Sequence, residues 1–141
     1  MSYDPTLVQP MRDELTRLGV RELRTAEEVD EILSNAPGTT LVIVNSVCGC
    51  AARNARPAVA LAMRHRLQPD RAVTVFAGQD VEATARTREF FTGFRPSSPS
   101  VGLLKEGEVV FMLERHQIEG RDALEIANDI IGAYDRFCLA A

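Results

Sequence analysis

The chain has 141 residues and a mass of 15.5 kDa, so we expect residues 1–141 to form one domain. Hydrophobic residues (45%) and charged residues (26%) occur at proportions typical of soluble globular proteins, and a net charge of −4 argues against a nucleic-acid partner. The longest purely apolar run, Ala58 to Met63, is far shorter than the roughly 20 residues of a membrane span. The N-terminus shows no signal-peptide pattern. We therefore expect a cytoplasmic protein without a membrane partner.

The first half of the chain predicts two helices and two strands. Apolar residues at helical spacing predict a helix from Leu7 to Leu18, and Val20–Leu23 is a possible short strand. Thr25 and Glu28 form a capping-box pattern, which begins a second helix. The run Thr40–Asn45 is continuously apolar and β-branched, which is typical of a strand covered on both faces.

Helix and strand patterns continue to alternate after this strand. An alanine-rich stretch from Ala51 to about Leu67 predicts a helix in which Pro57 forces a kink or a late start. A second buried strand is predicted over Ala72–Phe76. A helix capped by Asp80 follows over Val81–Phe91.

The last part of the chain predicts a hairpin and a final helix. Strands over Ser100–Leu104 and Val109–Leu113 are separated by so short a link that they must pair antiparallel. Asp122 caps the last helix. Its predicted inner face consists of Leu124, Ala127, Ile130, Ile131 and Tyr134. This element order predicts an α/β fold of three layers, with a mixed central sheet and helices on both faces. It is the order of a thioredoxin-like fold with an extra N-terminal helix.

Two of the three cysteines lie where chemistry is expected. Cys48 and Cys50 come directly after the buried strand and before a helix, and sites in open α/β sheets form beyond the carboxyl ends of the strands. Unpaired N–H groups at a helix start favour an anion, so a thiol there should have a pKa below that of free cysteine. We predict that Cys48 is the nucleophile and that Cys50 is the resolving thiol.

The spacing of the pair predicts a labile disulfide. Two cysteines separated by one residue of extended chain sit near the upper limit of about 6.8 Å between Cα atoms for a disulfide. Gly49 tolerates the bend that a bond requires. A bond of this kind should be strained and easily reduced, which suits a thiol that is reset often.

Other interpretations of the pair remain open. The cysteines are either redox-active, or two small buried residues, or ligands for a soft metal such as Cu(I) or Zn(II). A closed zinc site needs four ligands, and only Cys138, His65 and His116 are left to complete one. None of these has motif spacing to the pair, so we expect no metal. A non-catalytic metal-binding or redox-sensing adaptor is the alternative outside enzymes.

Pro99 and two arginines are candidates for substrate contacts. In thioredoxin-like folds a cis-proline before a strand faces the active cysteine, so we predict a cis Ser98–Pro99 bond, the alternative being an ordinary trans proline at a strand start. Arg53 and Arg56 either favour an anionic thiol substrate or are solvated surface charges. His116 lies beyond the last strand and is either near the site or on the surface.

Several segments resemble the bacilliredoxin family. Val44–Ala52, which contains the Cys-Gly-Cys motif, is followed by Ala55–Ala58. Further similar segments are Val73–Asp80, Phe91–Gly93, Pro96–Ser100 and Arg115–Gly120. The resemblance runs from the first helix to the terminal cysteine and covers essentially the whole chain.

The resemblance implies a cytosolic bacterial protein that removes bacillithiol from S-thiolated client proteins. Cys48 aligns with the attacking thiol and Cys50 with the second motif cysteine. Disulfide reductase or isomerase activity is the alternative within the same chemistry. We assign substrate binding to Gly49, Arg53, Ser98 and Pro99, with bacillithiol as thiol co-substrate and no other cofactor. The sequence predicts no oligomeric state.

Overall fold

The computed structural model describes residues 2–138, and within them the strands form a mixed five-stranded sheet in the order β1-β3-β2-β4-β5. The strands are β1 (Arg21–Glu22), β2 (Thr39–Asn45), β3 (Arg71–Phe76), β4 (Ser100–Lys105) and β5 (Glu108–Leu113). β3 pairs in parallel with β1 and β2, whereas β4 pairs antiparallel with β2 and β5. The predicted order of helices and strands produces this mixed sheet.

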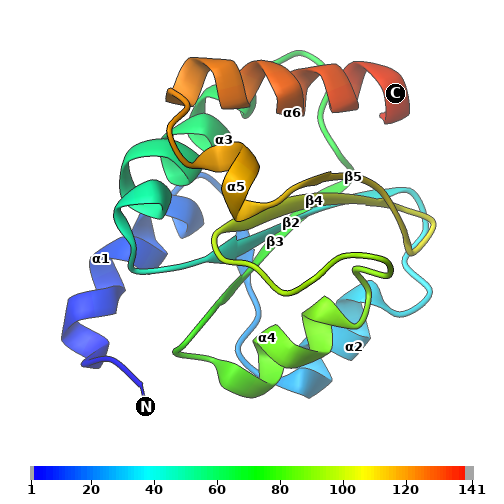
Figure 1. Ribbon diagram of the computed structural model, residues 1–141. Coiled ribbons are helices and arrows are strands. Elements are labelled where there is room, and N and C mark those ends of the chain that lie inside the picture. The colour runs from blue at the N-terminus through cyan, green and yellow to red at the C-terminus, as the bar shows by residue number, and fades with distance from the viewer. Residues whose placement is uncertain (1, 139–141) are drawn as a thin grey trace.

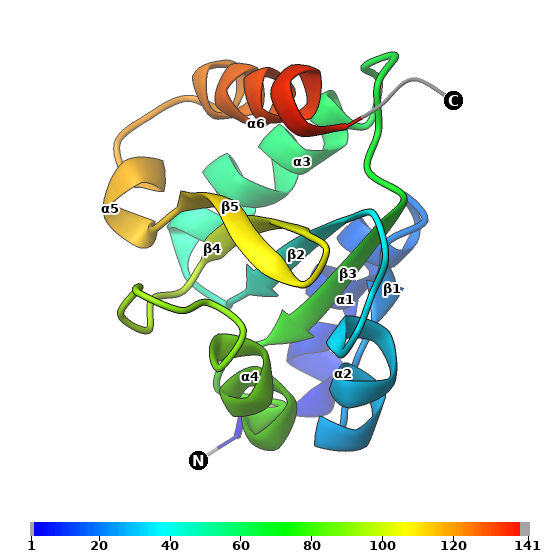
Figure 2. The same ribbon diagram turned by 90° about the vertical axis from the view of Figure 1, so that its right-hand side faces the viewer.

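Helices cover both faces of the sheet (Figure 1). They are α1 (Pro5–Thr16), α2 (Ala26–Leu33), α3 (Arg56–Ala62), α4 (Val81–Arg88), α5 (Arg115–Ile118) and α6 (Ala123–Phe137). Figure 2 shows α3 and α6 on one face, with α2 and α4 on the other. The predicted extra N-terminal helix is α1, whose Leu15 packs into the same core as α3 and α6. None of the helices in the described residues is long and apolar enough to cross a membrane.

β2 is the central strand, and every one of its residues is buried. Leu41 and Ile43 belong to the core beneath α3 and α6, whereas Val42 and Val44 belong to the core of α2 and α4. A strand covered on both faces needs apolar side chains at successive positions, which is what its sequence provides. The loop that follows β2 is therefore attached to a strand that is packed on both faces.

The helix predicted over residues 51–67 is shorter than expected. The chain first makes a wide π-helical turn, and regular α3 follows because Pro57, which has no N–H to donate, fits the first helical turn. The predicted late start is therefore confirmed. The predicted end is wrong, since α3 stops where the Gln68 side chain donates to the carbonyl oxygens of Ala62 and His65.

Three further details differ from the sequence predictions. Asp80 precedes α4 but makes no capping bond, because its carboxylate accepts two hydrogen bonds from Arg12 at 2.7 and 3.0 Å. Leu124 was assigned to the inner face of the last helix but is 61% exposed, while Ile126 and Ala133 occupy that face. The short helix α5 was not predicted at all.

Candidate active site

Cys48 and Cys50 follow the C-terminal end of β2 and lie at the start of the helical segment that leads into α3. Both cysteines are free, and their Sγ atoms form a hydrogen bond 2.7 Å long. Cys48 is partly exposed, whereas Cys50 is 9% exposed. The fold thus brings the two predicted catalytic thiols into contact, and Cys48 is the more accessible of the two.

Hydrogen bonds at Cys48 favour its ionised form. Burial alone would raise the pKa of the Cys48 thiol, but the thiol of Cys50 and the hydroxyl of Ser46 donate to the sulfur and lower that pKa below its ordinary value. The backbone N–H groups of Cys50 and Ala51 act in the same direction. The Cys48 N–H in turn donates to Ser46 Oγ at 3.1 Å, which fixes the hydroxyl beside the sulfur. The lowered pKa agrees with the prediction from the helix start.

Cys50 is perturbed in the opposite direction. Burial raises the pKa of the Cys50 thiol, and the neighbouring Cys48 thiolate raises it further. Arg115 partly offsets these effects because a cation stabilises a thiolate. While Cys48 is ionised, Cys50 therefore keeps its proton and donates it to the Cys48 sulfur.

The buried side chain of Arg56 supports the loop between β2 and the cysteines. Arg56 is 3% exposed, and its Nη1 donates to Asn45 Oδ1 and to the carbonyl oxygen of Ser46, each at 2.9 Å. Its Nε lies 3.1 Å from Glu14 Oε2 of α1, an ion pair without hydrogen-bond alignment. Neither alternative predicted for Arg56, a cation that faces substrate or a solvated surface charge, is correct. Arg56 instead has a structural role, because its buried guanidinium holds Asn45 and Ser46 in place.

Gly49 provides space rather than backbone freedom in this structure. Its φ lies outside the left-handed region that favours glycine, so the predicted conformational reason does not apply to the reduced pair. A Cβ at position 49 would instead lie 2.6 Å from Arg53 Nη2. The guanidinium of Arg53 therefore packs directly over the residue between the two cysteines.

An open hollow of about 470 Å³ surrounds the pair. Its lining residues are Cys48, Gly49, Cys50, Arg53, Asn54, Arg115, Glu119 and Gly120. Four of the six predicted site residues thus lie together. The other two, Ser98 and Pro99, are not part of this lining.

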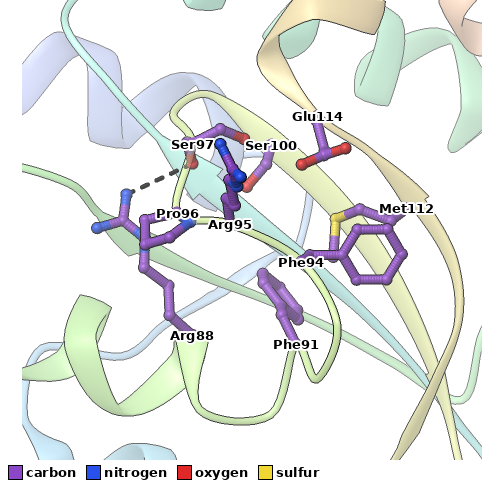
Figure 3. A pocket seen from close by; sticks show the side chains of 9 residues that line it. All are labelled: Arg88, Phe91, Phe94, Arg95, Pro96, Ser97, Ser100, Met112 and Glu114. Carbon is purple, nitrogen blue, oxygen red and sulfur yellow. Dashed lines mark hydrogen bonds between the residues drawn. The ribbon is translucent and has the colours of Figure 1, made fainter.

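The cis-proline loop reaches the hollow through Arg115. The Ser98–Pro99 bond is cis, as predicted. Arg115 donates from its backbone N–H to Ser97 Oγ at 3.3 Å and from Nη1 to the carbonyl oxygen of Ser98 at 3.4 Å. On its other side the loop covers a small cavity of about 10 Å³, where the guanidinium of Arg88 points toward Ser97 and donates to its carbonyl oxygen at 3.4 Å (Figure 3). Arg115 and Arg88 thus hold the loop from two directions.

Arg115 is the site residue that sequence reasoning missed. It lies in α5, which follows the edge strand β5 in the sequence. In the sheet, β4 lies between β5 and β2, the strand that leads to the cysteines. The sequence signalled it only as part of the stretch 115–120 that resembles bacilliredoxins. Its proximity to the cysteines comes from the way α5 folds back over the sheet end, which no local pattern indicates.

The remaining candidate residues lie apart from the pair. Cys138 is buried at the opposite end of β2, where its thiol donates to Thr39 Oγ1 at 3.7 Å. His65 Nε2 lies 2.6 Å from Asp135 Oδ1, and His116 is exposed. Over residues 2–138, no group of three or more His, Cys, Asp or Glu side chains is arranged to hold a metal ion.

Thioredoxins are among the solved structures that resemble this chain. A mutant thioredoxin of Halobacterium salinarum matches with a TM-score of 0.55 and 17% identity, over 86% of this chain and 92% of its own. The thioredoxin of Fasciola hepatica matches with a TM-score of 0.54 and 19% identity, over 82% and 99% of the two chains. These likenesses define the class of the protein as thioredoxin-like, and the chain carries two free thiols in contact at the end of its central strand.

Sequence relatives narrow this class to a family. A bacilliredoxin of Shouchella clausii is 56% identical over 132 residues, which is 94% of this chain and 92% of the relative. A bacilliredoxin of Koribacter versatilis is 50% identical over 136 residues, with 96% and 94% covered. The model of the family described as disulphide isomerase matches residues 3–138. The chain therefore belongs to the bacilliredoxin family, as the Cys-Gly-Cys segment predicted.

Proposed function

We propose that the protein removes bacillithiol from S-bacillithiolated proteins, with Cys48 as the attacking thiol and Cys50 as the resolving thiol. The observation that carries this proposal is the contact between an accessible thiol of lowered pKa and a buried thiol of raised pKa. The names of the relatives, bacilliredoxins, support the substrate class.

The proposed reaction has two exchanges. The Cys48 thiolate attacks the bacillithiol sulfur of the mixed disulfide, so that a Cys48–bacillithiol bond forms and the client cysteine leaves as a thiolate that takes up a proton. Cys50 then attacks the Cys48 sulfur, which forms the Cys48–Cys50 disulfide and releases bacillithiol as a thiol. Client and bacillithiol are reduced while the pair is oxidised. Two further thiol groups, which become a disulfide themselves, must then supply the two electrons that reset the pair.

The electrostatics of the pair support this order of events. Cys50 is held protonated partly by the Cys48 thiolate. Once Cys48 carries bacillithiol, that negative charge is gone, whereas the positive charge of Arg115 remains. The pKa of Cys50 then falls, so the resolving thiol becomes reactive only after capture has occurred.

The other proposed roles surround this pair. Gly49 and Arg53 lie in the hollow where the thiol group of the substrate would sit. Ser98 and Pro99 form the cis-proline loop that Arg115 ties to the same hollow and that would meet the backbone of the client. The reaction needs a thiol co-substrate and no other cofactor. Because it needs reduced thiols, we place it in the cytoplasm.

A client protein loaded with bacillithiol tests the proposal. We expect release by the wild type, no release by Cys48→Ala, and a trapped Cys48 adduct detectable by mass spectrometry in Cys50→Ala. Release that persists in Cys48→Ala would show that the nucleophile is assigned wrongly.

Disulfide isomerisation is the second candidate, favoured by the description of the matching family model. Refolding of a protein with scrambled disulfides measures this activity. Faster turnover of the scrambled protein than of the bacillithiol adduct, at equal substrate concentration, would favour isomerisation.

A further inference from the structure

The hollow beside the cysteines carries a free positive charge. Arg53 is exposed, and in the part of the chain that the structure describes, its guanidinium has no hydrogen-bond or ion-pair partner. It packs over Gly49, within 2.6 Å of the position a Cβ would take there. An exposed cation without a carboxylate to neutralise it therefore lines the same hollow as the reactive cysteine.

The second cation of the hollow is already engaged. Arg115 Nε donates to Glu119 Oε2 at 2.9 Å, and Nη1 donates to the carbonyl oxygen of Ser98. Its charge is shared with Glu119, which also lines the hollow. Arg53 is consequently the side chain best able to receive an anionic group from outside.

We propose that Arg53 is a receptor for a carboxylate of the small thiol that Cys48 captures, so that the protein prefers mixed disulfides of carboxylate-bearing low-molecular-weight thiols. This inference rests on the proposed function, because transfer to Cys48 places the small thiol in the hollow. A guanidinium donates two parallel hydrogen bonds to a carboxylate, and the hollow, at about 470 Å³, has the size of a small-molecule site.

Three adducts of one single-cysteine client test the preference. The client is loaded with glutathione, which is anionic, with 2-mercaptoethanol, which is neutral, or with cysteamine, which is cationic. Release rates are measured for the wild type, Arg53→Gln and Arg64→Gln. Arg64 is a matched control, since it is exposed and lies beyond α3, outside the hollow.

We expect Arg53→Gln to slow glutathione release about fivefold, which is the factor that an ion pair worth about 1 kcal/mol provides. Release of 2-mercaptoethanol should change less than about twofold, and cysteamine release should become faster. Salt should slow glutathione release by the wild type but not by Arg53→Gln, because ions screen an exposed charge pair. Arg64→Gln should behave as the wild type.

An equal effect of Arg53→Gln on all three adducts, or no effect on any, overturns the inference. Failure of the proposed function would look different. In that case the wild type would not release bacillithiol from a client loaded with it, or Cys48→Ala would release bacillithiol as fast as the wild type.

Discussion

Replacing Gly49 by alanine tests whether position 49 needs glycine for the space beside its Cα or for its backbone conformation. The φ of Gly49 is one that alanine adopts, so the backbone does not resist the change. The new Cβ would lie 2.6 Å from Arg53 Nη2, whereas ordinary contact needs about 3.5 Å. The guanidinium must therefore move by about 1 Å, which it can do because Arg53 is exposed. We expect the free energy of unfolding to change by no more than about 0.5 kcal/mol.

The same displacement should weaken selection for anionic thiols. Binding groups generally need to be held within about 0.5 Å of their productive position, so a shift of about 1 Å should lower the preference for glutathione over 2-mercaptoethanol about threefold. Urea unfolding and the two release rates measure both effects. The effects of Gly49→Ala and Arg53→Gln on this preference should not add, because both act through one guanidinium. A large loss of stability, or equal slowing of both adducts, would show that position 49 needs glycine for its backbone.

Two further predictions concern the loop that carries Cys48. Ser46→Ala removes a hydrogen bond to the thiolate worth about 1.5 kcal/mol, so iodoacetamide should alkylate Cys48 more slowly at pH 7, by up to about tenfold. Because the folded protein lowers the pKa of Cys48, alkylation by the wild type should persist below the pKa of free cysteine and disappear as pH falls through the lowered pKa, whereas in Ser46→Ala it should disappear at higher pH. An unchanged pH profile would exclude Ser46 as a cause of the low pKa. Arg56→Met should lower the free energy of unfolding in urea by about 2 kcal/mol, because the buried carbonyl of Ser46 loses its partner. The matched change Glu14→Gln should lower the free energy of unfolding by less than about 1 kcal/mol, because that carboxylate is half exposed. Equal losses in the two variants would contradict the claim that the hydrogen bonds of Arg56 stabilise this loop.

The fold could be predicted because its strongest signals are local. The run that forms β2 is apolar at every position, and a strand buried on both faces requires that pattern. Parallel pairing then follows from the helices between strands, and the hairpin follows from the short link between β4 and β5. Cys48 and Cys50 were found for the same reason, since their position after that strand is written in the sequence.

The supporting residues could not be predicted because their partners are distant in sequence. Asp80 has the sequence position of a helix cap, but Arg12, 68 residues away, takes both carboxylate oxygens. Arg56 and Arg53 look alike in the sequence, three residues apart, yet one is buried beneath the loop and the other is exposed over Gly49. The π-helical turn between the two cysteines and α3 gives the two side chains these different directions, and no pattern in the sequence predicts that turn.

The extra helix α1 provides a hydrogen-bond partner for a buried polar side chain at the end of β2. A strand packed on both faces delivers polar groups into the interior when it ends, and buried polar groups need hydrogen-bond partners. Asn45 meets this need by donating from Nδ2 to the carbonyl oxygen of Met11 in α1, at 3.2 Å, and by accepting from Arg56 and from the backbone of Ser46. Glu14 of α1 balances the charge of the buried Arg56. The loop before Cys48 is therefore joined through Asn45 to α1 and through Arg56 to α3, and the extra helix is part of the support of the reactive cysteine.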